Sequence, residues 1–227
     1  MLSGKGLLTP IQRDFVDLFA SLPDQEQFYL TGGTALAEFY LGHRLSFDLD
    51  FFTAEEPLIV PFSRHLEQVC AQRGWTVEVG RRFASYVEFI VARKGEQLRV
   101  DLALDSPFRL EPPEISKYGI RVNGRLDLMV DKVLAYYGRA EPRDAVDLYF
   151  ILQAESLEHL LPLAKRKDPG FDLYWFAVAL NKARSFPDEI DRWPVKMLLD
   201  LDPVALKREF HRLALGIMAQ LDEPPMR

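Results

Sequence analysis

The sequence predicts an α+β fold, with a mixed sheet and flanking helices in its first half and helices alone in its second half. Two observations predict this division. Alternating apolar residues, typical of strands, recur between residues 27 and 104. From Gly124 onward apolar residues follow helical spacing instead. We therefore expect domains at residues 1–123 and 124–227, with the boundary near residues 121–124.

The first half alternates helices with strands. Thr9-Pro10 should begin a helix, because threonine can cap it and proline suits its first turn. Further helices are expected over residues 35–41, ended by Gly42, and over the stretch that carries Phe62, Leu66 and Cys70. Strands are expected at residues 27–30, 46–52, 75–79, 84–92 and 97–104, with a hairpin turn at residues 93–96.

The second half reads as a set of helices. Apolar stripes run from Leu126 to Tyr137 and from Ala145 to Leu152. Further helices are expected near residues 157–165, 172–183 and 203–218. We expect the aromatic run Tyr174-Trp175-Phe176 to lie in the core of these helices and not to form a base-stacking platform.

Composition is that of an ordinary globular protein, with 227 residues, 48% of them hydrophobic and 27% charged. A single cysteine, Cys70, excludes an intrachain disulfide and fits a reducing compartment. No apolar run approaches the ~20 residues of a membrane span, and no signal-peptide pattern opens the chain. We therefore expect a cytoplasmic protein without a membrane partner.

The segment Phe47-Asp48-Leu49-Asp50-Phe51 is the most informative. On a strand, Asp48 and Asp50 project to one face while the apolar residues pack on the other. Two such carboxylates repel each other unless a cation lies between them, and Mg²⁺ prefers oxygen ligands of this kind. Asp101, between Val100 and Leu102, would supply a third ligand if its strand is a neighbour. Three carboxylates can hold two metal ions, although an isolated Asp-x-Asp is often only a solvated face.

A glycine pair lies upstream of these aspartates, in Thr31-Gly32-Gly33-Thr34. Glycines between a strand and a helix let the backbone approach a triphosphate, and the helix offers unpaired N–H groups to phosphate oxygens. A Gly-Gly turn alone is usually only a turn. Followed by a helix and an Asp-x-Asp strand, it becomes a specific combination.

Residues 31–36 and the pattern His43-Arg44-x-Ser46-x-Asp48-Leu49-Asp50-Phe51-Phe52 resemble the signature of the AbiEii/AbiGii toxin family, nucleotidyltransferases of the DNA polymerase beta-like superfamily. The resemblance implies a nucleotidyltransferase fold, with a mixed sheet and a helical half that completes the nucleotide and acceptor cleft. It implies nucleotide binding by Gly32, Gly33 and Thr34, and metal binding by Asp48, Asp50 and Asp101. Arg44 and Ser46 would brace the aspartates or touch phosphate.

The resemblance continues through Asp131-Lys132, Arg139 and Arg143-Asp144-x-x-Asp147. It implies that Lys132 and Arg139 face the nucleotide as cations and that Lys132 and Asp144 join the catalytic residues. Asp144 and Asp147 would orient Lys132 or serve the acceptor. The alternative is that these residues form ion pairs on the surface.

By this resemblance the chain transfers a nucleoside monophosphate from an NTP to an acceptor hydroxyl, with Mg²⁺ as cofactor. Family members are toxins of toxin–antitoxin pairs, and some modify tRNA, so RNA and an antitoxin are the expected partners. Two alternatives remain open: a small-molecule modifier akin to aminoglycoside nucleotidyltransferases, and a non-catalytic member that binds nucleotide or antitoxin.

The formal net charge of −6 argues against broad contact with phosphates. The RNA acceptor that the resemblance implies and this negative charge are compatible if only a short end of the RNA is bound. Under that interpretation the basic run Lys165-Arg166-Lys167, which precedes a turn, is the best candidate for a peripheral RNA anchor.

Overall fold

The computed structural model describes residues 1–222. The chain forms two compact units, Met1–Leu128 and Met129–Arg227. The boundary between them falls within helix α4 (Arg125–Arg139). The first unit contains both helices and strands and the second is mainly helical, as the sequence predicts. The assignment of domains to residues 1–123 and 124–227 stays a prediction.

A seven-stranded mixed sheet forms the centre of the first unit. Its strands are β1 (Tyr29–Thr31), β3 (Leu49–Thr53), β4 (Thr76–Phe83), β5 (Tyr86–Arg93), β6 (Glu96–Leu104), β7 (Glu114–Ile115) and β8 (Arg121–Val122). They lie in the order β4-β5-β6-β3-β1-β8-β7. Strand β3 is central, parallel to β6 and antiparallel to β1. A two-residue strand, β2 (Arg44–Leu45), precedes it.

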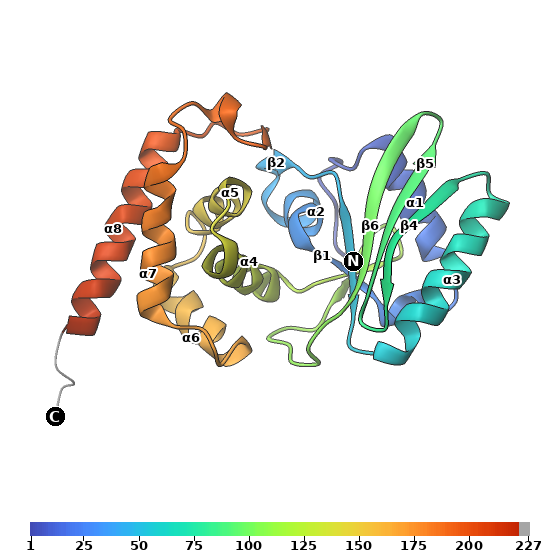
Figure 1. The fold of residues 1–227 in the computed structure, drawn as a ribbon, viewed down its shortest axis with the longest axis horizontal. Helices are drawn as coiled ribbons and strands as arrows, with labels where there is room; N and C mark the ends of the chain where they lie inside the picture. The colour runs from blue at the N-terminus through green and yellow to red at the C-terminus, as the bar shows by residue number, and fades with distance from the viewer. Residues whose placement is uncertain (223–227) are drawn as a thin grey trace. The chain divides into compact units, whose positions relative to one another are not determined.

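Helices α1 (Pro10–Ala20) and α3 (Glu56–Gln72) cover one face of this sheet, and α2 (Gly32–Ala35) lies against the other (Figure 1). A π-helical segment, Leu36–Leu41, extends α2 as far as Gly42. The expected cap of α1 is present, since the Thr9 hydroxyl accepts from the backbone N–H of Gln12 and the Gln12 side chain accepts from that of Thr9.

Buried and less buried side chains alternate along β3, and this alternation shows which face of the strand lies in the core. Leu49 and Phe51 are fully buried on the side of α1 and α3, and the Phe51 ring stacks on that of Phe19 with ring centroids 3.9 Å apart. Asp50, between them, therefore lies on the opposite face, on the side of α2.

The hairpin between β5 and β6 sits where the sequence predicts it. Lys94 and Gly95 both have positive φ, 52° and 82°, which is the backbone of a two-residue turn that matches the twist of the strands. This short turn fixes the register, so that Glu88 pairs with Asp101. The side chains of two acidic residues thereby become neighbours on the face away from α1 and α3.

The second unit begins within α4 and continues through α5 (Pro142–Ile151), α6 (Leu157–Lys167), α7 (Leu173–Lys182) and α8 (Pro203–Asp222), with a two-residue strand β9 (Lys196–Met197). These helices match the segments that the sequence predicts. Helices α7 and α8 pack side by side (Figure 1).

The aromatic run in α7 differs from its prediction. Phe176 is fully buried, but Tyr174 and Trp175 are 46% and 59% exposed, so the expectation that all three belong to the core is wrong for two of them. A helix turns by about 100° per residue, so three consecutive aromatic residues cannot share one buried face.

The single cysteine lies in the core of the first unit. Cys70 is buried in α3, and burial raises the pKa of its thiol to about 11, so the thiol is protonated and inert near neutral pH. Among residues 1–222, no helix has the length and apolar character needed to cross a membrane.

We predict that Phe51→Ala lowers the free energy of unfolding by about 3–5 kcal/mol, because it removes a fully buried ring from the core side of β3. Urea denaturation followed by circular dichroism would measure this loss. Phe83→Ala is the control, since Phe83 is 61% exposed and its loss should change stability by less than about 0.5 kcal/mol. Equal losses in both variants would contradict the assigned core.

Candidate functional site

The acidic residues of the central strands meet on one face of the sheet. Asp50 in β3 pairs in register with Asp101 in the parallel strand β6. Their neighbours along each strand, such as Phe51 and Val100, are fully buried on the other face. The sequence-based condition that the strand of Asp101 be a neighbour of the strand of Asp50 is therefore met.

Asp48 lies immediately before β3, which is shorter at its start than the sequence predicts. Its backbone carbonyl accepts a hydrogen bond from the Thr34 hydroxyl at 2.5 Å, and Thr34 is buried. This bond ties the start of β3 to α2. The structure thus gives Thr34 a positioning role, and its contact with a nucleotide stays a prediction.

The glycine pair makes room for polar side chains of the protein itself. Gly32 has a φ of +72°, and a Cβ there would lie 2.0 Å from a carboxylate oxygen of Asp50. A Cβ on Gly33 would lie 2.7 Å from the Arg44 guanidinium and 2.9 Å from the Ser46 hydroxyl. Only glycine therefore allows the turn to approach the acid on one side and the Arg44–Ser46 pair on the other.

Arg44 and Ser46 belong to the segment that leads into β3. Arg44 is buried and donates to the carbonyl of Leu45 at 3.0 Å. The side-chain amide of Gln12, in the first turn of α1, donates to the carbonyl of Ser46 at 3.0 Å. Sequence reasoning missed this function of Gln12, because its only local signal is the capping box with Thr9.

Asp101 is paired with an arginine in the structure. Arg99 donates to both oxygens of Asp101, at 3.1 and 2.9 Å, and its guanidinium lies 2.9 Å from Glu88 of β5. The hydrogen bonds to Asp101 raise the pKa of Arg99 further above its ordinary value. Glu88 was not identified from the sequence. Its only signal there is its place between two apolar residues of a strand, which many surface acids share.

The carboxylates suit a divalent cation in their chemistry. Oxygen donors from Asp48, Asp50 and Asp101 are the ligands that Mg²⁺ prefers. Within residues 1–222, no three His, Cys, Asp or Glu side chains are gathered as a ready ligand set. Asp101 is turned to Arg99 instead. To act as a ligand, Asp101 would exchange this cation for a metal ion, while Glu88 retains the arginine.

A second polar cluster lies between α4 and α5. The Lys132 ammonium is 2.7 Å from Asp147 and 3.9 Å from Asp144, and both acids are fully buried. Arg139 donates two hydrogen bonds to Asp144, at 2.5 and 2.7 Å. Lys132 itself is 6% exposed. The alternative of surface ion pairs is therefore wrong for Lys132, and the ion pair through which Asp147 would orient Lys132 is present.

The proposed RNA anchor is only partly available to a ligand. Lys165 and Arg166 are exposed, as expected, but Lys167 is paired with Asp131 at 2.6 Å and its side chain is only 7% exposed. Lys165 donates to the backbone carbonyls of Pro169 and Phe171. These bonds hold the turn after α6, which is a structural role that basic residues at a helix end commonly have.

We predict that Lys132→Met lowers the free energy of unfolding by about 3–5 kcal/mol, because it leaves Asp147 buried without this partner. A lysine facing solvent would instead leave the stability nearly unchanged. Urea denaturation would measure the difference. Arg143→Met is the control, because the Arg143–Glu141 pair is about half exposed and should contribute less than about 1 kcal/mol.

Comparison with known proteins assigns the family. The model of the AbiEii nucleotidyltransferase toxin family, of type IV toxin–antitoxin systems, matches residues 13–220. An uncharacterised protein of Aquifex aeolicus is 29% identical over 181 residues, covering 78% of this chain and 82% of that protein.

Two solved structures share the fold. MenT4, a nucleotidyltransferase toxin of Mycobacterium tuberculosis, matches with a TM-score of 0.61 and 18% identity over 93% of this chain and 83% of its own. JHP933 of Helicobacter pylori matches with a TM-score of 0.57 and 18% identity over 92% and 90%. The chain belongs to the AbiEii nucleotidyltransferase toxin family and is a nucleotidyltransferase.

Proposed function

We propose that this protein transfers a nucleoside monophosphate from an NTP to a hydroxyl group of an RNA acceptor, in a reaction that depends on Mg²⁺. The pairing of Asp50 with Asp101 beside the Gly32-Gly33 turn carries this proposal. It puts two carboxylates next to a backbone turn that a phosphate chain can approach, with Asp48 two residues before Asp50. We place the reaction in the cytoplasm, where NTPs and RNA are present.

Asp48, Asp50 and Asp101 would hold Mg²⁺, in two ions by the sequence-based expectation, and bound Mg²⁺ would neutralise charge on the triphosphate. The backbone N–H groups of the Gly32-Gly33 turn would bind phosphate oxygens, together with the Arg44 guanidinium and Ser46 hydroxyl that lie directly beside Gly33. These donors would orient the triphosphate so that its α-phosphorus faces the acceptor.

In the reaction the acceptor oxygen forms a bond to the α-phosphorus, and the bond from that phosphorus to the β-phosphate oxygen breaks. Pyrophosphate leaves with the electron pair. Asp101 would receive the proton of the acceptor hydroxyl, once it has been released from Arg99. Glu88, already 2.9 Å from Arg99, would keep that guanidinium in place meanwhile.

For the second unit we propose positioning roles. Asp144 holds Arg139 by two hydrogen bonds, and Asp147 holds Lys132. Asp144 would thus act through Arg139 and not by touching the substrate. The contact of Lys132 and Arg139 with the nucleotide remains a sequence-based prediction.

Membership of a toxin family supports a proposal for the acceptor and the partner. We propose tRNA or another RNA as the acceptor and a cognate antitoxin protein as the partner, because the family model describes toxins of toxin–antitoxin systems. The net charge of −6 favours an acceptor that is held by few phosphates.

Asp48→Asn, Asp50→Asn and Asp101→Asn should each reduce transfer by more than about 10²-fold, or ~2.7 kcal/mol of barrier. Each removes charge from the proposed metal site while keeping the size of the side chain. The assay incubates the protein with each α-labelled NTP and total cell RNA, and counts label in RNA.

Circular dichroism of the three variants controls for folding. Near wild-type turnover of Asp101→Asn would remove Asp101 from the site. Labelling of a small aminated acceptor but of no RNA would favour the small-molecule alternative. No label in any acceptor, with NTP still bound, would favour a non-catalytic member.

Gly32→Ala should abolish transfer, because its Cβ would displace the Asp50 carboxylate. Gly74→Ala is a matched control. Gly74 has nearly the same φ, +74°, but nothing lies within 4 Å of a Cβ there. Both variants should lose stability by about 1–2 kcal/mol from the left-handed backbone alone. Only Gly32→Ala should lose transfer in the labelling assay, and equal activity of the two variants would contradict the proposed part of Gly32.

A further inference from the structure

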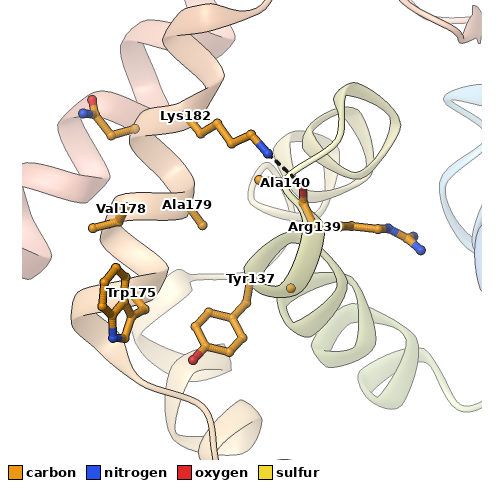
Figure 2. Close-up of a pocket in the computed structure, with 9 residues that line it drawn as sticks. Tyr137, Arg139, Ala140, Trp175, Val178, Ala179 and Lys182 are labelled. Carbon is orange, nitrogen blue, oxygen red and sulfur yellow. Dashed lines mark hydrogen bonds between the residues drawn. The ribbon is translucent and has the colours of Figure 1, made fainter.

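An exposed tryptophan borders a groove in the second unit. The groove has a volume of about 640 Å³ and lies between α7 and the end of α4. Trp175, Val178 and Lys182 of α7 line it together with Tyr137 and Ala140, and the Lys182 side chain extends toward Ala140 (Figure 2). The Lys182 ammonium donates to the carbonyl of Arg139 at 3.1 Å. The side chain of Arg139 itself points away from α7 (Figure 2).

Trp175 differs from the other tryptophans of the chain. Trp75 and Trp193 are 5% and 4% exposed, whereas Trp175 is 59% exposed. Its ring packs edge-on against Tyr174, with centroids 5.2 Å apart. A large ring that is more than half exposed is typical of a surface that meets another molecule.

A basic hollow adjoins this groove at the end of α7. It has a volume of about 290 Å³ and is lined by Arg184, Val204, Lys207, Arg208 and His211. The four residues from α8 recur at positions that share one face of a helix.

The two hollows are joined by a hydrogen bond. His211 of the basic hollow pairs with the side chain of Asn181, which lines the groove, at 3.0 Å. Arg184 follows Lys182 by only two residues. An aromatic ring in the first turn of α7, a lysine at its end and a group of cations beyond that end therefore follow one another along the helix.

The cations that line this hollow differ in whether an acidic residue pairs with them. Lys207 is paired with Asp188. Within residues 1–222, neither Arg184 nor Arg208 forms an ion pair, and both are exposed. Exposed guanidinium groups without acidic partners are suited to phosphate oxygens.

We propose that this face of α7 and α8 binds single-stranded RNA, with a nucleobase stacked on Trp175 and backbone phosphates on Arg184 and Arg208. The inference rests on the proposed function, since the RNA would be the acceptor. Aromatic stacking next to cations is how proteins bind single strands without reading sequence. Two unpaired arginines beyond one end of α7 and an exposed indole near its other end fit a strand of phosphates better than the apolar centre of a protein interface.

The test measures binding of a labelled single-stranded RNA to the full chain by fluorescence anisotropy, without NTP. Trp175→Ala should weaken binding about tenfold, and Trp175→Phe should retain most of the affinity. Arg184→Glu with Arg208→Glu should lower the slope of log affinity against log salt by about 1.4, for two contacts at roughly 0.7 each.

A matched control reverses two exposed cations of the first unit, Arg64→Glu with Lys94→Glu. It changes the net charge equally and should leave the salt slope unchanged. Tryptophan fluorescence gives a second readout. RNA should quench it in the wild type and not in Trp175→Phe, because Trp75 and Trp193 are buried.

The outcomes separate this inference from the proposed function. Label transfer to RNA with equal RNA affinity in all variants would overturn the inference and leave the proposed function standing. RNA binding that depends on Trp175, without label transfer to any RNA, would support this inference and overturn the proposed function. A copurifying protein that Trp175→Ala releases, with RNA affinity unchanged, would overturn the RNA assignment in favour of a protein interface.

Discussion

The candidate site depends on the register between β3 and β6, which puts Asp50 beside Asp101 on one face of the sheet. Adjacent strands lie about 4.8 Å apart, so the two carboxylates repel each other and the backbone cannot separate them. The opposite face enforces this register. Leu49, Phe51 and Val100 are fully buried there, and a slip of one residue would turn the acids into the core. Burial of apolar side chains on one face thus holds like charges together on the other.

This arrangement needs positive charge before any substrate binds. Asp101 is 9% exposed, and a charge that is so little hydrated is costly unless it is paired. Arg99 supplies the pair, and because Glu88 lies in register with Asp101, the guanidinium bridges both acids. The neighbouring acids Glu88, Asp101 and Asp50 are therefore compatible with a stable sheet without a metal ion. A divalent cation would meet the same electrostatic requirement, so the arginine and the metal compete for Asp101 in the proposed mechanism.

Periodicity predicted the helices and the main strands, and alternation placed Asp50 opposite the core, because both depend on local sequence. Partners from other elements were not predictable. The opposition of Glu88 and Asp101 depends on the length of the hairpin turn. The burial of Lys132 depends on acids that α5 supplies, which no projection of α4 alone contains. The apolar run around Trp175 predicts a helix. Which side of that helix stays exposed to solvent depends on how the neighbouring helices pack against it.

Positive charge is scarce in this chain, with 28 basic residues against 34 acidic ones, and its distribution limits where phosphate can bind. Lys132 is held by Asp147 inside the α4–α5 cluster, and Lys167 is held by Asp131. Cations that the sequence offers as phosphate ligands are thus engaged with the protein's own acids. A nucleic-acid contact is favoured where guanidinium groups without acidic partners and an exposed ring are both available. Within residues 1–222, Arg184 and Arg208 form no ion pair and line the hollow beyond the end of α7, whose first turn carries the exposed Trp175. The acidity of the chain as a whole therefore does not conflict with an RNA acceptor that a few locally unpaired cations hold.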